Sequence, residues 1–291
     1  MKANNITYEL RLNLVILWCL KLIFWYTKIM IEVLQNIKFI FFISVFFLMF
    51  SLEYYFPKRK WETHRIKRLG FHGLLSIFNT VVMYIPRIFL IIPALMIVNE
   101  NNLGLLNIID QSFIVEALIA LLILDFAYYW WHRLSHTIPF LWRFHSVHHG
   151  DTHVDVNTSL RFHFGELVLS AVYRMLLVFL IGVPISVFIF YEILLSSASH
   201  FHHSNINLPD KIDDKLSKFI VSPKYHTTHH TVRATSRDSN YCSFLTIWDR
   251  VFFTYQESND KDRLYLGLED RSLELKMIKN IAMPFKKTGI S

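Results

Sequence analysis

The chain is poor in residues that build several common classes of protein. Only two of its 291 residues are cysteines, Cys19 and Cys242, which excludes both a disulfide framework and an iron–sulfur cluster held by one chain. The sequence contains no internal repeat, no low-complexity linker and no haem-binding, flavin or ferredoxin segment. It also lacks the cleavage pattern of a secretory signal peptide, so apolar segments near its start are expected to remain in the mature protein.

Apolar residues are abundant instead. They make up 53 % of the chain, aromatic residues 16 % and charged residues only 18 %, a composition typical of a protein that crosses a membrane several times. The formal net charge is +7, but the basic residues stand beside the apolar segments and form no separate patch. They are better explained as cytoplasmic flanks that contact anionic lipid, and nucleic acid is not an expected partner.

The apolar segments predict an all-α fold: a multi-span transmembrane helical bundle with a cytosolic helical cap. Residues 1–36 are an N-terminal extension whose interrupted apolar run fits a short span, an interfacial helix or neither. Residues 37–255 are the membrane-embedded domain, and 256–291 are a polar basic tail. Within the domain we predict a cap from 132–165 and 200–255, and spans at 37–56, 74–98, 112–131 and, as a hairpin, 167–199.

Two features of the loops predict the orientation of the bundle. Six of the eleven residues in Lys58–Arg68 are Lys or Arg, which indicates a cytoplasmic loop. The loop at 99–111 has neither and should lie on the opposite side. Pro86, Arg87 and Pro93 interrupt the segment between these loops, which is either one kinked span or a re-entrant pair. His64 and His72, in or beside the basic loop, are expected to face solvent or lipid.

The most informative residues are histidines that recur at helical spacing. They form one pair, His132-x-x-x-His136, and two triplets, His145-x-x-His148-His149 and His226-x-x-His229-His230. At an average density, an 18-residue window would hold about one of the 15 histidines, whereas 132–149 holds five. Residues three and four apart share a helix face, and imidazole is the commonest metal-binding side chain. Since one tetrahedral ion takes four ligands, eight imidazoles predict two metals.

One carboxylate is a candidate for supporting these imidazoles. Asp125 precedes His132 by seven residues, on the same helix face, and could hold an imidazole by its other nitrogen. The alternatives are an ion pair with Arg133 or a buried polar residue within the span.

The order and spacing of these motifs resemble the fatty acid hydroxylase/sterol desaturase superfamily of integral-membrane, histidine-box di-iron proteins. The likeness runs from about Met30 to Tyr255. It rests on DFAYYWWHRLSH, PFLWRFHSVHH, SLRFHFGE, FHHSN with the following Leu208–Pro209, SPKYHTTHH and NYCSFLTIWDRVFFTY. The first 29 residues have no counterpart in the usual start of the family.

The resemblance implies an O₂-dependent oxidation of a lipid C–H bond by two non-haem iron ions, which zinc can replace in purified protein. Electrons would come from an external donor, such as a cytochrome b5-like protein or a ferredoxin with its reductase. The histidine boxes would face the cytoplasm, at a bacterial inner membrane or at the endoplasmic reticulum. The implied metal ligands are His132, His136, His145, His148, His149, His163, His203, His226, His229 and His230.

Other residues carry weaker implications. His153, His200 and His202 are alternatives to His163 and His203, the two implied ligands outside the three histidine clusters. Asn240 and the triplet Trp248–Asp249–Arg250 match the tail of the family, where structural support of the third box is expected. Three residues depart from the usual pattern: Phe164 replaces a proline, and Cys242 and Phe253 replace glycines. A lost glycine matters only where the backbone needs a positive φ.

Several functions remain open from sequence alone. Hydroxylation, desaturation and cleavage of an ether lipid after hydroxylation require the same oxidant, and a fatty acyl chain, a sterol and an ether lipid are all candidate substrates. A histidine-rich membrane metal transporter and a catalytically inactive metal-binding scaffold are the alternatives. Transport sites usually lie near the bilayer midplane at broken helices, whereas these boxes stand at span ends, so the sequence favours the enzyme.

Overall fold

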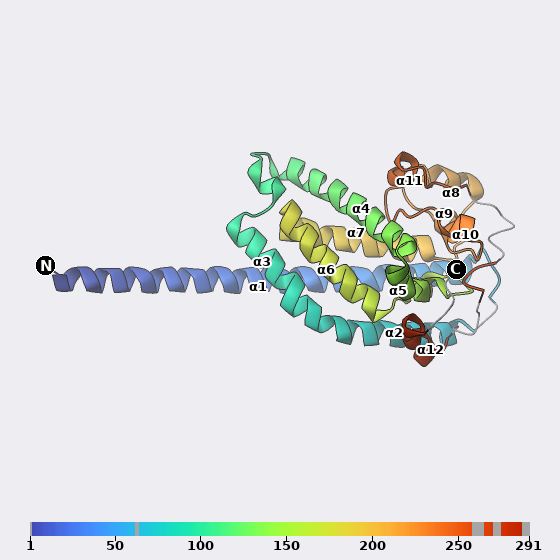
Figure 1. Ribbon diagram of the computed structural model, residues 1–291, viewed down its shortest axis with the longest axis horizontal. Helices are drawn as coiled ribbons and strands as arrows, with labels where there is room; N and C mark the ends of the chain where they lie inside the picture. The colour runs from blue at the N-terminus through green and yellow to red at the C-terminus, as the bar shows by residue number, and fades with distance from the viewer. Residues whose placement is uncertain (1, 62–63, 258–264, 270–274, 287–291) are drawn as a thin grey trace.

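A computed structural model describes residues 2–61, 64–257, 265–269 and 275–286, with side chains from residue 29 onward. These residues form the predicted all-α bundle (Figure 1). The long helices of the bundle are α1 (Lys2–Tyr55), α2 (Arg65–Pro86), α3 (Ile92–Asn101), α4 (Phe113–Thr137), α6 (Phe164–Ile181) and α7 (Ile185–His203).

Four helical segments in the described part of the chain are long and apolar enough to cross a membrane. They are Ile29–Tyr55, Arg65–Ile108, Phe113–Thr137 and Phe164–Ile181. The first begins eight residues before the predicted span at 37–56, and α1 has no break at the predicted boundary after residue 36. Helix α7 meets α6 at a tight turn and packs along α1.

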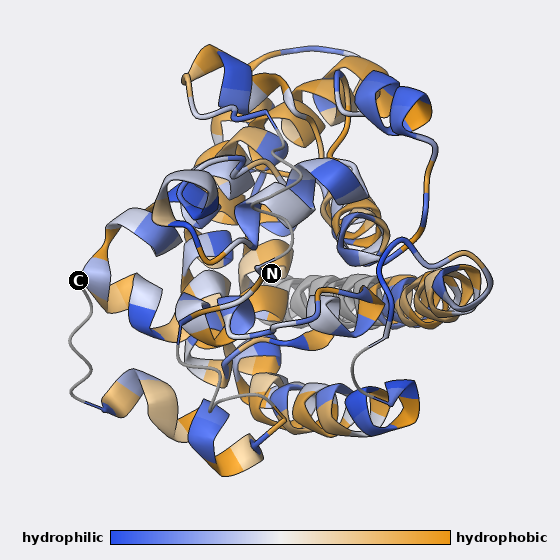
Figure 2. Ribbon diagram, turned by 90° about the vertical axis from the view of Figure 1, so that its right-hand side faces the viewer, coloured by the Kyte–Doolittle hydropathy of each residue, from blue (hydrophilic) through white to orange (hydrophobic). Residues whose placement is uncertain are grey.

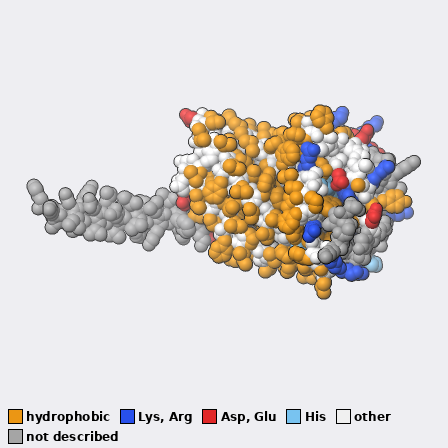
Figure 3. All heavy atoms as spheres, viewed as in Figure 1, with side chains coloured by type: hydrophobic (Ala, Val, Ile, Leu, Met, Phe, Trp, Pro, Cys, Tyr) orange, Lys and Arg blue, Asp and Glu red, His pale blue; other side chains and the backbone are white. Residues whose placement is uncertain are grey.

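Apolar side chains cover the outside of the bundle as well as its core. Leu95, Val98, Leu124 and Phe188 are buried in the largest apolar cluster. Between 11 and 33 % of each spanning window is buried, and Figure 3 shows hydrophobic side chains spread over the flank of the bundle. Such a surface is stable where hydrocarbon, not water, is the solvent. The chain is therefore a membrane protein.

The segment between the basic loop and the loop at 99–111 is one kinked helix, which decides between the two predicted alternatives. Helix α2 ends at Pro86, a π-helical turn spans Arg87–Ile91, and α3 continues from Ile92. Proline has no N–H and clashes with the preceding turn, so the helix bends where Pro86 and Pro93 interrupt it.

The predicted hairpin at 167–199 corresponds to α6 and α7, joined by residues 182–184. Gly182 has a φ of +77°, and a Cβ atom there would lie 2.4 Å from the carbonyl oxygen of Leu103. Only glycine allows this turn to contact the loop before α4. Helix α6 is one of the candidate spans.

The remaining elements form a cap at the end of the bundle that also carries the loop after α1 (Figure 1). Figure 2 looks onto this end, where hydrophilic and hydrophobic residues alternate along the segments nearest the viewer. The helical elements of the cap are α5 (Pro139–His149), the 3₁₀ turn η3 (Val156–Leu160), α8 (Asp210–Leu216), α9 (Pro223–His229), α10 (Ala234–Arg237), α11 (Ile247–Val251), α12 (Met277–Ala282) and η6 (Met283–Phe285).

Candidate metal centre

The predicted histidine clusters meet at the junction of bundle and cap. There, nine imidazoles from α4, α5, α7 and α9 form two groups, and within each group the candidate ligand atoms lie within 4.8 Å of one another. We call them group one (His132, His136, His145, His149 and His229) and group two (His148, His203, His226 and His230). The groups do not follow the sequence boxes, because α5 and α9 each contribute to both.

In group one, the Nδ1 atoms of four rings form hydrogen bonds with oxygen atoms outside the group. His132 and His229 donate to the backbone carbonyls of Tyr241 and Ser239, each over 2.7 Å. The other two rings contact carboxylates: His145 contacts Glu166 at 2.8 Å, and His136 contacts Asp238 at 3.1 Å. These oxygens are acceptors, so each Nδ1 carries the proton and each neutral ring presents a lone pair at Nε2.

Group two contains two rings with the same arrangement. His148 donates from Nδ1 to the carbonyl of Arg161 at 3.0 Å, and His203 donates to the carbonyl of Ser199 at 2.8 Å. Their Nε2 atoms nevertheless face each other at 3.1 Å. If both rings are neutral, two lone pairs point at one another with no proton between them, an arrangement that a shared cation would stabilise.

Burial keeps the rings neutral. The pKa values of His148, His149, His226, His229 and His230 lie well below that of a free histidine, first because burial disfavours the charged form and then because the rings neighbour one another. The Nε2 atoms of His136, His145 and His229 are buried without a hydrogen-bond partner among the described residues, as are both nitrogens of His149. Orphaned buried nitrogens of this kind are otherwise costly.

The spacing within group two also fits a bound ion. Its Nε2 atoms are separated by 3.0 Å between His226 and His203 and by 3.2 Å between His230 and His226. Nitrogens that bind one ion at ~2.0–2.1 Å lie roughly 3.0 to 3.4 Å apart in octahedral or tetrahedral geometry. A set made only of imidazoles suits iron, zinc, copper or nickel. The residues present therefore fit two transition-metal ions.

His163, the tenth predicted ligand, lies outside both groups. Its Nδ1 atom accepts a hydrogen bond from the backbone N–H of Gly165 at 2.9 Å, and its Nε2 atom donates to the carbonyl of Ile281 at 3.1 Å. The ring caps the N-terminus of α6 and ties it to α12. With both nitrogens engaged, His163 has no lone pair left for a metal in this arrangement.

Asp125 does not contact an imidazole, which corrects the prediction that it holds one by its second nitrogen. Its carboxylate accepts hydrogen bonds from Trp248 Nε1 at 2.8 Å, from the hydroxyl of Tyr191 at 3.1 Å and from the N–H of Leu245 at 3.3 Å. Seven residues put it on the face of His132 but about 10.5 Å away along the axis, at 1.5 Å per residue. Its alternative interpretation, a buried polar residue within the span, is the one observed.

Asn240 stands between the two carbonyls that hold His229 and His132, those of Ser239 and Tyr241. Its φ is +53°, and its side-chain amide donates to the carbonyls of Tyr225 and Gln256. It therefore shapes the backbone behind group one without touching a ring.

Asp249, the acid of the predicted support triplet, accepts from the hydroxyl of Tyr225 at 2.7 Å and from the N–H groups of Tyr241 and Cys242. It therefore joins α11 to α9 and to the segment behind group one. Of the two lost glycines, only the one replaced by Phe253 has a positive φ, +55°. The backbone at Cys242 needs no glycine.

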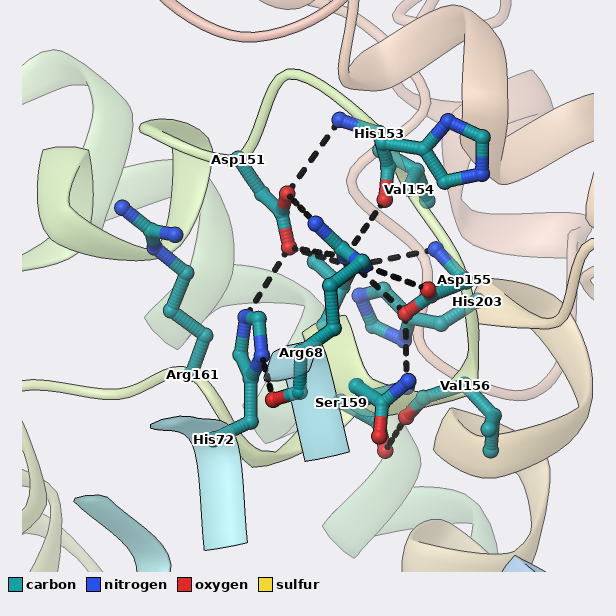
Figure 4. Close-up of polar contacts among 12 residues, drawn as sticks. Arg68, His72, Asp151, His153, Val154, Asp155, Val156, Ser159, Arg161 and His203 are labelled. Atoms are coloured by element: carbon teal, nitrogen blue, oxygen red, sulfur yellow. Dashed lines mark hydrogen bonds and ion pairs between the residues drawn. The ribbon is translucent and has the colours of Figure 1, made fainter. Parts of the chain in front are cut away.

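A buried ionic network behind group two has no signal in the histidine pattern (Figure 4). Arg68 is 0 % exposed and forms ion pairs with Asp151 at 2.9 Å and Asp155 at 2.7 Å. His72 contacts the same Asp151 oxygen that pairs with Arg68, at 3.1 Å. Burial alone would raise the pKa of Asp151, but the Arg68 charge outweighs it and holds the pKa well below its usual value.

This network corrects our interpretation of the basic loop. His72 is expected from the sequence to face solvent or lipid, yet it is fully buried, as is Arg68, because α2 begins at Arg65 and turns this face toward the cap. His64, just before α2, is exposed. The pairing fixes residues 151–155, which lead directly from His149 to the segment whose Arg161 carbonyl holds His148. The acidic partners lie more than eighty residues away in sequence, so no local pattern could identify them.

Of the three weaker alternatives, His153 lies in the cap, and His200 and His202 lie at the end of α7 that meets it. His200 contacts the hydroxyl of Ser159 at 2.7 Å, and the ring of His153 packs against Trp61. His202 lies against group two, with its ring centroid 4.1 Å from that of His226 and a buried Nδ1 atom without a hydrogen-bond partner in the described part of the chain.

Comparisons with known proteins agree with the motif resemblance. Residues 117–254 match the sequence family described as fatty acid hydroxylase. An ornithine lipid hydroxylase of Rhizobium tropici is 26 % identical over 174 residues, covering 60 % of this chain and 51 % of the relative. An alkylglycerol monooxygenase of Xenopus tropicalis is 32 % identical over 147 residues, covering 50 % of this chain and 31 % of the relative.

A third relative is a very-long-chain aldehyde decarbonylase of Oryza sativa subsp. japonica, 28 % identical over 156 residues and covering 51 % of this chain and 25 % of the relative. The chain thus spans about half the length, or less, of these curated relatives. No solved structure gives a significant match.

Proposed function

Because residues 117–254 are a domain of the fatty acid hydroxylase family, we propose that this protein is a di-iron membrane oxidoreductase that hydroxylates or desaturates a lipid with O₂. The observation that carries the proposal is the convergence of Nε2 lone pairs in two adjacent groups. Rings whose Nδ1 atoms are already committed to acceptors, as in His132, His148 and His203, have only one nitrogen left for a ligand.

We assign one iron to each group. Group one would be held by His132, His136, His145, His149 and His229, and group two by His148, His203, His226 and His230. When bound, the two irons supply the oxidising power that an unactivated C–H bond requires. Because the two groups share α5 and α9, the sites lie beside each other, as a two-metal reaction requires.

The protein's own part is to hold the ligands still and to exclude water. Glu166 and the carbonyls of Tyr241, Ser239 and Arg161 fix the tautomers, so no ring has to rotate or lose a proton on its inner nitrogen when metal binds. Burial of the rings keeps bulk water from the oxidant, which limits side reactions during turnover.

The placement of the groups supports a lipid substrate. They lie at the end of the span α4, beside the apolar flank of the bundle, so a lipid can approach from the bilayer without leaving it. The named relatives act on ornithine lipids, alkylglycerols and very-long-chain aldehydes, which favours an acyl or alkyl chain over a sterol as the oxidised part. A site at a span end also favours an enzyme over a transporter.

Two further parts of the proposal concern the surroundings. We assign the cap to the cytoplasmic side, because the basic loop at Lys58–Arg68 lies at the same end as the histidine groups. Electrons would reach the irons from an external donor, a cytochrome b5-like protein or a ferredoxin with its reductase, docking on the cap.

Lipid analysis under ¹⁸O₂ tests the proposal. Cells that express the protein should accumulate a lipid that is absent from cells expressing His148→Ala, with equal amounts of both proteins in the membrane. Incorporation of ¹⁸O indicates hydroxylation, and the loss of two hydrogens without label indicates desaturation. Identical lipids in both cultures, with metal flux into vesicles that carry the protein, would instead support a transporter.

A further inference from the structure

Helix α11 lies against the outward side of a membrane-spanning helix. The ring of Trp248 packs on Phe126 of α4 at a centroid distance of 5.1 Å, and its indole N–H reaches Asp125. Phe252, just after α11, also packs on α4: its ring stacks on that of Tyr129 at a centroid distance of 5.4 Å. One face of α11 is therefore fixed to the end of α4 that carries His132.

The other face of α11 is apolar and is left uncovered by the residues that the structure describes. Ile247 and Val251 are four residues apart, hence on one helix face, and each is 51 % exposed. Phe253 is 95 % exposed. Phe219 is 68 % exposed and lies beside them, because its carbonyl accepts from the N–H of Thr246. We call Phe219, Ile247, Val251 and Phe253 the outer patch.

Phe253 is the least expected member of the outer patch. Its φ of +55° is rare for a bulky residue and favours glycine, yet the described part of the chain leaves the side chain 95 % exposed. In water, an exposed aromatic ring would contribute no packing energy to offset the cost of this backbone conformation. The geometry is explained if the ring is buried in something outside the chain.

Continuity with the apolar flank identifies that environment. Leu118 and Leu122 of α4 are exposed within the spanning segment that α11 covers at its end. Cations also stack on aromatic rings around the patch: Arg133 lies 5.1 Å from the ring of Trp130, and Arg250 lies 4.7 Å from that of Tyr255. Tryptophan, tyrosine and arginine together are typical of the headgroup level of a membrane.

We propose that the outer patch is embedded in the lipid leaflet next to the cap, with Phe253 inserted among the acyl chains. The bilayer is thus the partner of α11, and the cap is seated in the membrane surface instead of standing clear of it. This inference rests on the membrane location of the bundle and not on the proposed reaction, so the two can fail separately.

Spin-label accessibility tests the proposal in the full-length protein. In a Cys19→Ser background, Phe253→Cys is labelled with a nitroxide after reconstitution into phosphatidylcholine–phosphatidylglycerol nanodiscs. Protein without the added cysteine measures any labelling of the buried Cys242. Collisions with O₂, which concentrates in lipid, are compared with collisions with a water-soluble nickel chelate. Asp214→Cys on α8, whose side chain is 58 % exposed, is the aqueous control.

The label at 253 should be rich in O₂ collisions and poor in nickel collisions, with a depth of about 5–10 Å below the phosphates. Val251→Cys, two residues earlier, should give the same contrast and covers the case in which the Phe253 variant folds poorly. Nickel accessibility at 251 and 253 equal to that at 214 would overturn the proposal. Dipolar broadening between labels would overturn it as well, because a second copy of the chain would then cover the patch.

Discussion

The two histidine groups use the same side chain but are held in different ways. Group one is oriented partly by carboxylates, those of Glu166 and Asp238, in addition to two carbonyls of the segment at 239–241. In group two, the Nδ1 atoms of His148 and His203 contact backbone carbonyls, and those of His226 and His230 have no hydrogen-bond partner among the described residues. The segment after His149 is fixed by the buried Arg68 network. Metal affinity should therefore respond to different mutations in the two groups.

The difference shows that identical imidazole ligands can differ in metal affinity because their Nδ1 atoms have different hydrogen-bond partners. A carboxylate at Nδ1 makes the imidazole a stronger donor than a neutral carbonyl does. Group one should on this basis hold its ion more tightly per ring. Group two depends instead on whether the polypeptide around it keeps its shape.

The largest effect on activity is expected from substitutions at two adjacent histidines, one in each group. His229→Ala should release the ion of group one and His230→Ala the ion of group two, each leaving one ion per chain. If both metals act together, as proposed, turnover should fall about a thousandfold or more in either variant, as when one member of a catalytic unit is removed. Metal analysis and lipid turnover are the measurements. Loss of both ions from each variant would mean that the groups are one site.

Arg68→Met should have the largest effect on stability. It leaves Asp151 and Asp155 buried without their cation, a loss of roughly 3–5 kcal/mol in the free energy of unfolding. Group two should lose its ion before group one does. Thermal unfolding in detergent and metal analysis measure the effect, and Lys67→Met, at the exposed neighbour, is the control. Equal unfolding temperatures for both variants would refute the role of the network.

Glu166→Gln should act on group one alone. Replacing the carboxylate by an amide weakens the donor strength of His145 and should reduce metal affinity by about 10- to 100-fold. Competition with a chelator measures the affinity of each group. Asp238→Asn should have a smaller effect, since this carboxylate is 45 % exposed and water can replace it, and Glu116→Gln at the far end of α4 should have none. A change confined to group two would reverse our assignment.

The smallest effect is expected for His163→Ala. Loss of the cap on α6 should cost about 1 kcal/mol of stability, while both ions remain bound. Unfolding and metal content are measured on the same preparation. Release of one ion would restore His163 to the ligand set that the family resemblance implies.

All nine members of the two groups are among the ten ligands that the family resemblance implies, but their division into two groups could not be predicted. Spacings of three and four residues place His145, His148 and His149 on one helix face, and that much is local. Which ring points to which neighbour depends on how α4, α7 and α9 pack around α5. His148 consequently belongs to a different group from His145 and His149, although all three come from a single box.

Spacing also misled where distance along the helix mattered. Asp125 shares a face with His132 but lies two turns away, so it anchors α11 instead of a ligand. The actual holders of the rings are mostly backbone carbonyls, which every residue has and no sequence pattern marks. The bundle was more predictable, because long apolar runs, the prolines of the kink and the glycine of the turn act locally.

Counting metal ions per chain in the wild-type protein tests the central claim most directly. Protein expressed in iron-replete cells and purified without chelators should hold two transition-metal ions per chain, one for each histidine group, whether iron or zinc occupies them. A content of one ion, or of none after reloading with ferrous iron, would contradict the account of two adjacent sites.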